Sequence, residues 1–202
     1  MTAKASEQPS SLDRAWFDRP ALALARDLLG CRLVHDAEGG TVGGRIVETE
    51  AYRGPEDLAA HSSRGRTARS AVMFGPPGFL YVYLIYGLHH CLNVVAGPGE
   101  KPEAVLIRAL ELDEGLDLAR ARRGAAAAAH RLASGPGNVG RALGVDRRHN
   151  GLDLLSGPVR IEPVARRPRV ARGPRVGVGY AGPWAARPMR FWIADEPHVS
   201  RR

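Results

Sequence analysis

Residues 41–52 read TVGGRIVETEAY and follow another β-rich run, CRLVHD (residues 31–36), across the short segment AEGG. Two β-rich runs that meet at glycines are typical of an antiparallel hairpin. Alternate residues of a strand share one face and lie about 6.5 to 7 Å apart, so Glu48 and Glu50 point the same way, with Glu50 near the strand end. The stretch therefore predicts a hairpin that carries two carboxylates on one face.

The chain before this hairpin predicts one helix. FDRPALALARDLLG (residues 17–30) has an aspartate before an early proline, apolar residues at helical spacing and a closing glycine, so we expect a helix near residues 19–29. The first residues, 1–12, are small and polar without a secretory signal pattern. We therefore expect a flexible N-terminal tail over residues 1–12, a single domain over residues 13–202, a cytoplasmic location and no membrane span.

The chain after the hairpin predicts a long loop and a second hairpin. Residues 53–78 are polar and broken by glycine and proline, as is typical of loops that carry function, and His61 lies within them. FLYVYLIYG (79–87) and LHHCLNVVA (88–96) are β-rich and meet at a turn beside Tyr86. AVLIRALEL (104–112) then predicts an apolar strand that is interrupted by Arg108.

Helices and short extended segments are expected in the C-terminal half. DEGLDLARARRG (113–124) and AAAAAHRLASG (125–135) predict helices, and GPGNVGRALGV (135–145) predicts a short third helix. The remainder reads as short strands and loops in VRIEPVA (159–165), RVGVGYAG (175–182) and MRFWIAD (189–195). No internal repeat and no linker marks a second domain.

The charge balance favours an anionic partner. The chain of 202 residues has 29 lysines and arginines against 21 acidic residues, which gives a net charge of +8 and a pI near 10.3. Such an excess attracts polyanions, among which nucleic acid is the commonest. Cys31 and Cys91 are expected to be buried free thiols, as suits a reducing compartment.

The two glutamates of the first hairpin have a plain and a functional interpretation. Glu48 and Glu50 are either solvated carboxylates or a paired site, although a sugar hydrolase would need its carboxylates to flank the scissile bond. Arg108 favours the functional interpretation, because a guanidinium inside an apolar strand requires an acceptor. Glu50 is a candidate for that acceptor.

The second hairpin carries aromatic residues and a run of potential metal ligands. Tyr81 and Tyr83 share a face and fit core packing, whereas an exposed aromatic at Tyr86 fits a wedge or an anchor. The run HHC at 89–91 does not predict a metal site, because neighbouring strand residues face opposite ways and no second ligand pair follows.

Several long blocks together resemble a known family. GRIVETEAYRGPEDLAAHSSRGRTARSAVMFGPPGFLYVYLIYGLHHCLNVV (44–95), AVLIRALEL and RVGVGYAG are similar to the alkyladenine (3-methyladenine) DNA glycosylases, also called methylpurine glycosylases. The resemblance runs from about residue 13 to residue 199. It implies an α+β fold, a single mixed domain with a curved antiparallel β-sheet, flanking helices and a protruding hairpin that enters the DNA minor groove.

The resemblance also implies a role for each matching residue. Glu50 is the general base that deprotonates the attacking water, and Arg108 with the backbone carbonyl of Val176 helps to hold that water. Tyr86 is the wedge that fills the gap in the duplex. Four residues surround the flipped base, namely Tyr52, His61 and Tyr83 as stacking walls and Asn93 against the 2-amino group of guanine. Tyr180 stands where the family often has a histidine, and no cofactor or metal is implied.

The chemistry of base excision agrees with these roles. An enzyme that acts on a base in duplex DNA must extrude that base, and damage lowers the cost. A carboxylate beside the sugar stabilises an oxocarbenium-like transition state and activates water. We therefore expect double-stranded DNA with damaged purines as the substrate. 3-Methyladenine and 7-methylguanine are the first candidates, and hypoxanthine and ethenoadenine are further ones.

The lysines bear on the reaction type. Lys4 lies in the tail and Lys101 in a hairpin loop, so neither amine is placed to form the Schiff base of a glycosylase-lyase. We expect a monofunctional, monomeric enzyme that leaves an intact abasic site. Two alternatives stay open: a non-catalytic lesion-binding protein, which would not need Glu50, and a carbohydrate hydrolase, which would leave the positive charge unexplained.

Overall fold

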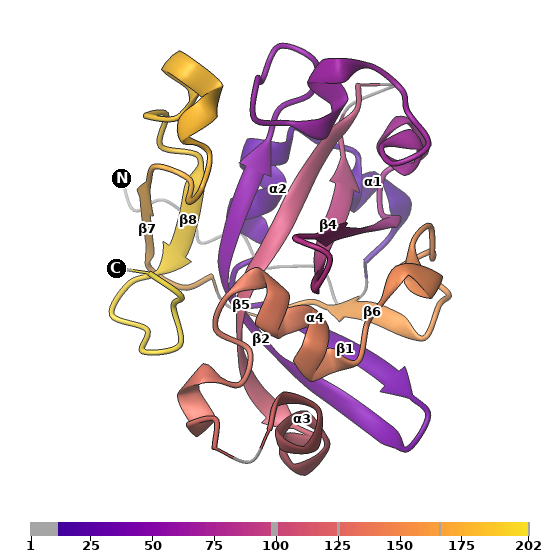
Figure 1. Cartoon of the computed structure of the whole chain (residues 1–202), viewed down its shortest axis with the longest axis vertical. Helices are drawn as coiled ribbons and strands as arrows, with labels where there is room; N and C mark the ends of the chain where they lie inside the picture. The colour runs from indigo at the N-terminus through magenta and orange to yellow at the C-terminus, as the bar shows by residue number, and fades with distance from the viewer. Residues whose placement is uncertain (1–11, 98–100, 125, 166, 202) are drawn as a thin grey trace.

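Two long antiparallel strands, β2 and β5, form the centre of the sheet in this computed structural model, which describes residues 12–97, 101–124, 126–165 and 167–201. The spatial order is β3–β4–β5–β2–β1–β6, and β8 pairs with both β2 and β7 (Figure 1). The strands are β1 (Arg32–Ala37), β2 (Gly40–Tyr52), β3 (Leu80–Ile85), β4 (His89–Ala96), β5 (Glu103–Glu114), β6 (Val159–Glu162), β7 (Val170–Gly173) and β8 (Arg190–Ile193). The fold is α+β with an antiparallel sheet, as predicted.

Short helices surround this sheet. The α-helices are α1 (Arg14–Phe17), α2 (Ala21–Asp27), α3 (Leu116–Arg123) and α4 (Pro136–Leu143), and the 3-10 helices are η1 (His61–Arg64), η2 (Ala71–Phe74), η3 (Ala129–Arg131), η4 (Arg147–His149) and η5 (Gly179–Trp184). The helix expected near residues 19–29 is α2, which is shorter because Pro20 caps its start and Gly30 has a positive φ of 91° beyond its end. No helix among the described residues has the length and apolar character needed to cross a membrane.

Close contacts connect helices α2 and α4 to the sheet. The Thr49 hydroxyl of β2 donates to the Ala25 carbonyl of α2 at 2.8 Å, which ties that helix to the central strand. On α4, a Cβ added to Gly140 would lie 2.3 Å from the carbonyl oxygen of His90, so only glycine allows this helix to approach β4 so closely. Residues 1–11 of the expected tail lie outside the described residues, and Leu12 packs against the core.

Irregular pairing at the sheet centre shapes the chain around the two glutamates. The β2–β5 register passes from Ile46↔Leu110 to Glu48↔Ala109, and then to Thr49↔Ile107. It therefore skips Val47 on β2 and Arg108 on β5. Such bulges bend a strand and redirect its side chains. The first part of β2 pairs with β1, whereas Glu48, Thr49 and Glu50 pair with β8. Glu48 and Glu50 therefore lie where β2 exchanges one neighbouring strand for another.

One predicted helix is absent. The prediction of a helix over residues 125–135 is wrong for the described part, because residues 126–135 form turns and the single 3-10 turn η3. The backbone here bonds to the sheet instead: the Leu110 amide donates to the Ala133 carbonyl at 3.1 Å, and Ser134 bridges to Ala109. Tertiary hydrogen bonds thus override the helical propensity of the alanine run. Strand β7 was not predicted.

Candidate active site

The bulges place two carboxylates and one guanidinium together in the interior. Glu48 and Glu50 have fully buried side chains, and Arg108 is 6% exposed. Arg108 Nε donates to Glu48 at 3.1 Å, and its Nη1 lies 3.3 Å from a Glu50 oxygen. The interpretation of the glutamates as solvated surface groups is therefore wrong, and Arg108 has the acceptors that its apolar strand requires.

Glu50 has a donor on each side of its carboxylate. The Val176 amide donates to Oε1 at 2.7 Å, and the Tyr52 hydroxyl donates to Oε2 at 2.9 Å. Burial raises the pKa of Glu50 above its ordinary value of 4.5, while the charge of Arg108 and the two hydrogen bonds oppose that rise. A buried carboxylate with a raised pKa, held in one orientation, has the properties of a general base.

Glu48 has a different environment, made up of structural contacts. It accepts from Arg108, from Arg190 Nη1 at 2.9 Å and from the Ser200 amide at 2.7 Å. Arg108 Nη2 also donates to the Ser200 hydroxyl at 3.3 Å. Glu48 therefore orients Arg108 from the side away from Glu50 and attaches the C-terminal segment to the sheet.

A cavity of about 420 Å³ opens in front of this group. Every predicted site residue except Glu50 lines it: Tyr52, His61, Tyr83, Tyr86, Asn93, Arg108 and Val176. Glu50 lies directly behind its wall, in contact with Tyr52, Arg108 and Val176. The structure thus gathers residues from the first hairpin, the second hairpin, β5, a loop after β2 and the segment before η5 around one cavity. Tyr180 also lines it and is 70% exposed.

Aromatic rings form one side of the cavity. The His61 and Tyr83 ring centroids lie 4.5 Å apart at an angle of 77°, and the Arg69 guanidinium lies 5.0 Å from the Tyr83 ring centroid. His61 Nδ1 is 2.8 Å from the Tyr81 hydroxyl. Burial, together with the positive charges of Arg69 and Arg64, lowers the pKa of His61 to about 4, so this ring is neutral at pH 7. The wall is therefore aromatic and uncharged where it faces the cavity.

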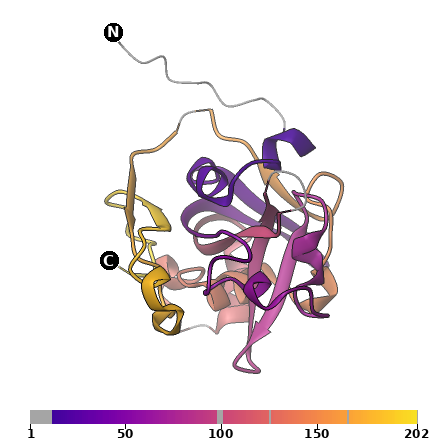
Figure 2. The ribbon, with the colours of Figure 1, turned by 90° about the horizontal axis from the view of Figure 1, so that it is seen from above.

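Two further residues complete the predicted set. Asn93 is 3% exposed, and its Nδ2 donates to the Tyr81 carbonyl at 3.1 Å, so its side chain is held in place at the cavity wall. Tyr86 lies at the tip of the β3–β4 hairpin with a positive φ of 53° and is 85% exposed. Figure 2 shows this hairpin projecting beyond the rest of the chain. Leu88, beside Tyr86, is 78% exposed.

Sequence reasoning missed other residues around the site. Tyr81 was interpreted as core, which its 1% exposure confirms, but it also lines the cavity on the same wall as Tyr83. Asp57 and Arg175 form a buried ion pair beside Tyr52, and nothing in their local sequence marks them. A second cavity of about 520 Å³ shares Asn138 with the first, and none of the acidic residues that the structure describes lines it. Its basic residues are Arg123, His130, Arg131 and Arg201.

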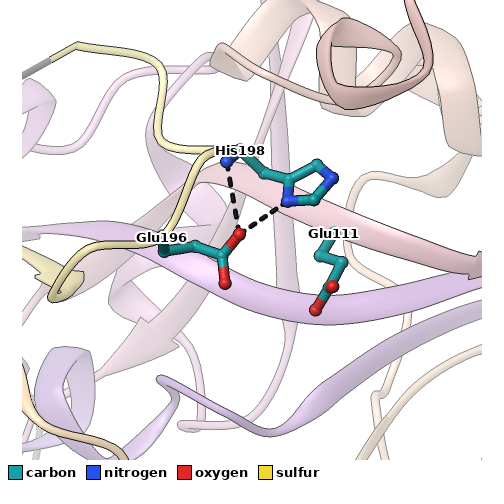
Figure 3. Close-up of side chains that lie close together, drawn as sticks. All are labelled: Glu111, Glu196 and His198. Carbon is teal, nitrogen blue, oxygen red and sulfur yellow. Dashed lines mark hydrogen bonds and ion pairs between the residues drawn. The ribbon is translucent and has the colours of Figure 1, made fainter.

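One side-chain cluster among the described residues has ligand atoms close enough for a metal ion. Glu111, Glu196 and His198 place their ligand atoms within 4.8 Å of one another (Figure 3). Arg45 Nη2 lies 2.6 Å from Glu111 and 2.7 Å from Glu196, and His198 Nδ1 lies 2.6 Å from Glu196. Arg45 pairs with both carboxylates and His198 contacts Glu196, so these four residues form an ion-pair and hydrogen-bond network.

Comparison with known proteins places this site in a family. The family model described as "Methylpurine-DNA glycosylase (MPG)" matches residues 15–197. A protein of Anaeromyxobacter dehalogenans (strain 2CP-C) is 52% identical over 94% of this chain and 86% of its own length. A protein of Myxococcus xanthus is 47% identical over 94% of this chain and 93% of its own. One of Methanocella arvoryzae is 48% identical over 95% and 96%.

All three relatives bear the name "Putative 3-methyladenine DNA glycosylase". The family model spans residues 15–197, a range that includes every residue lining the cavity described above. A cavity walled by aromatic rings, backed by a buried carboxylate and set in a basic chain suits an enzyme that acts on a nucleobase in DNA. The chain is a DNA glycosylase and belongs to the methylpurine-DNA glycosylase family.

Proposed function

We propose that this enzyme extrudes damaged purines from duplex DNA and hydrolyses the N-glycosidic bond with water activated by Glu50. The observation that carries this proposal is the buried carboxylate of Glu50 directly behind an aromatic cavity, next to Arg108. In the proposed step, Glu50 accepts a proton from water as the water oxygen bonds to C1′. The bond from C1′ to the base nitrogen breaks, and its electron pair leaves with the base.

Arg108 and Val176 assist that step in the proposal. The Val176 amide and Arg108 hold the Glu50 carboxylate in one orientation. We infer that Arg108 and the Val176 carbonyl also hold the attacking water. The negative charge of Glu50 additionally stabilises the positive charge that develops on the sugar. An N-alkylated purine that carries a positive charge leaves as a neutral base, and 3-methyladenine and 7-methylguanine fit this requirement.

The cavity walls support the choice of purines. In the proposal the extruded base stacks between Tyr52 on one side and His61 with Tyr83 on the other, and the main chain at His61 contacts its edge. A neutral His61 ring does not repel a positively charged base, which suits alkylated purines. In the proposal the fixed amide of Asn93 crowds the 2-amino group of guanine, so 7-methylguanine fits less well than 3-methyladenine although it too leaves as a neutral base. Hypoxanthine and ethenoadenine lack that group and are further candidates.

Duplex DNA and a monofunctional reaction complete the proposal. Tyr86 at the projecting hairpin tip is the proposed wedge that replaces the extruded base in the stack. Lys101, the one lysine among the described residues, does not line the cavity, and its amine lies 2.8 Å from Glu56 and 3.0 Å from Glu103. The described residues thus place no lysine amine at the cavity to form a Schiff base, so we expect an intact abasic site as the product.

The test uses a duplex with a single hypoxanthine and, in parallel, alkylated DNA. Glu50→Gln should lower base release by about 100-fold or more, since a general base contributes roughly 10² to 10⁴. Glu111→Gln, in the ion-pair network away from the cavity, is the matched carboxylate control and should retain wild-type rates. Strands should break only after alkali. Unchanged release by Glu50→Gln would remove Glu50 as the base, and tight binding without release by the wild type would favour a lesion-binding protein.

A further inference from the structure

Arg175 and Asp57 form a fully buried ion pair at the back of the active site. Both side chains are 0% exposed, and the guanidinium binds the carboxylate in a bidentate fashion, with Nη1 to Oδ2 at 2.6 Å and Nη2 to Oδ1 at 2.8 Å. Asp57 also accepts from the backbone amides of Arg53 at 3.1 Å and Ala59 at 3.1 Å. The pair therefore fixes the loop that leads from β2 towards His61.

The guanidinium reaches three other parts of the site. Arg175 Nη1 donates to the carbonyl of Ala51 at 2.9 Å, and Nη2 donates to that of Trp184 at 3.5 Å. Its central carbon lies 4.7 Å from the centroid of the Tyr52 ring. Arg175 thus connects the end of β2, the loop after it and the helix η5.

Arg175 is adjacent to both neutral hydrogen-bond donors to Glu50. Tyr52, whose ring lies against Arg175, gives its hydroxyl to Oε2. Val176, the next residue in the chain, gives its amide to Oε1. A shift of Arg175 would consequently displace both donors at once, and with them the orientation of the carboxylate.

We propose that Arg175 and Asp57 form a buried clamp that positions Tyr52 and the Val176 amide against Glu50, and that base excision depends on this positioning. The inference rests on the proposed function of Glu50. A buried ion pair in general adds little stability over a well-packed apolar pair, so stability alone does not account for it. Positioning accounts for it better, because a misplacement of about 1 Å can cost roughly 100-fold in rate.

The test replaces the pair with an apolar one. Arg175→Met combined with Asp57→Leu removes both charges together and avoids leaving one of them unpaired. The matched control is Arg14→Met with Asp153→Leu, another long-range ion pair, 2.6 Å apart, whose residues do not line the cavity. For each variant we would measure the single-turnover rate of base release, its pH dependence, the affinity for DNA with an uncleavable abasic analogue, and the Tm.

We expect the apolar Arg175/Asp57 variant to lose about 10- to 100-fold in rate, with affinity for the analogue changed less than threefold. The acid limb of its pH profile should also move to higher pH, because Glu50 loses the well-placed hydrogen bonds from Val176 and Tyr52 that lower its pKa. A role in stability alone would not move that limb. The control should match the wild type in rate and pH profile.

Arg175→Lys decides the matter where the apolar variant does not fold. It retains the charge and loses the two-pronged geometry, so we expect a reduced rate with a native Tm. Wild-type rate and pH profile in a folded variant that lacks the pair, or in Arg175→Lys, would overturn the clamp. That outcome, with Glu50→Gln still inactive, would leave the proposed function standing, whereas a wild type that releases no base would overturn the proposed function itself.

Discussion

At the scale of single residues, burial raises the pKa of Glu50 and the positive charge of Arg108 opposes that increase. The carboxylate acts only when deprotonated, so activity should rise with pH through the raised pKa of Glu50. Arg108→Gln removes the positive charge that lowers the pKa of Glu50. The acid limb of the pH–rate profile, where activity falls as Glu50 is protonated, should therefore lie at higher pH in this variant than in the wild type. Single-turnover base release between pH 4 and 8 measures the shift. Arg45→Gln, in the ion-pair network away from the cavity, should leave the limb in place.

His61 should make stability depend on pH. Its pKa is about 4 in the folded chain against an ordinary value of 6.5, so below pH 6.5 the unfolded chain takes up a proton that the folded chain does not. The stability from its neutral form is complete above pH 6.5 and is lost as pH falls towards 4. His61→Phe should therefore lose less free energy of unfolding between pH 7.5 and 5 than the wild type, as measured by urea denaturation. An equal loss of free energy of unfolding in the wild type and in His61→Phe would contradict the lowered pKa of His61.

Sequence reasoning reached part of this site for physical reasons. Arg108 interrupts an apolar strand, so the sequence predicted an acceptor for its guanidinium. In the structure the guanidinium pairs with Glu48 and Glu50. The different roles of the two glutamates depend on bulges that no local pattern reveals. The pair of Arg175 and Asp57 joins two loops that are distant in sequence, and loops lack the periodicity from which a shared face can be predicted.

The projecting hairpin is the element in which function and local stability conflict. Tyr86 has a positive φ, which costs a residue other than glycine roughly 1 kcal/mol. Its side chain is 85% exposed and contributes little packing. Tyr86→Gly should therefore raise the free energy of unfolding by up to about 1 kcal/mol while it weakens base release from duplex DNA. Leu58→Gly, at another exposed apolar residue, is the control for substitution by glycine and should not stabilise the chain.

Release from single-stranded DNA separates the wedge from a general defect. A wedge acts on the gap that an extruded base leaves in a duplex, so Tyr86→Gly should affect single strands much less. An equal loss on both substrates would argue against the wedge.

At the scale of whole elements, both hairpins could be predicted from the sequence because β-rich runs meet at turn residues. The alanine-rich run at 125–135 could not, because its backbone bonds with β5 are long-range.

At the scale of the whole molecule, the arginines differ in whether a carboxylate already pairs with them. Many arginines bind carboxylates, such as Arg32, which contacts Asp113, Glu114 and Glu162. Arg131 and Arg201, by contrast, form no ion pair with any described carboxylate, and both are exposed at the second cavity beside the active site. Because no described carboxylate pairs with Arg131 and Arg201, and because they lie beside the active-site cavity, we expect both to contact DNA phosphates.

The salt dependence of DNA binding tests whether Arg131 and Arg201 contact phosphates. Each phosphate contact contributes about 0.9 to the slope of log affinity against log salt concentration. Arg131→Gln with Arg201→Gln should lower the slope by about 1 to 2 on damaged and undamaged duplexes alike, because phosphate contacts carry no sequence or lesion information. Arg32→Gln removes a cation that is already neutralised and should leave the slope unchanged. If Arg32→Gln lowered the slope as much as the double variant, net charge rather than a defined face would govern DNA binding.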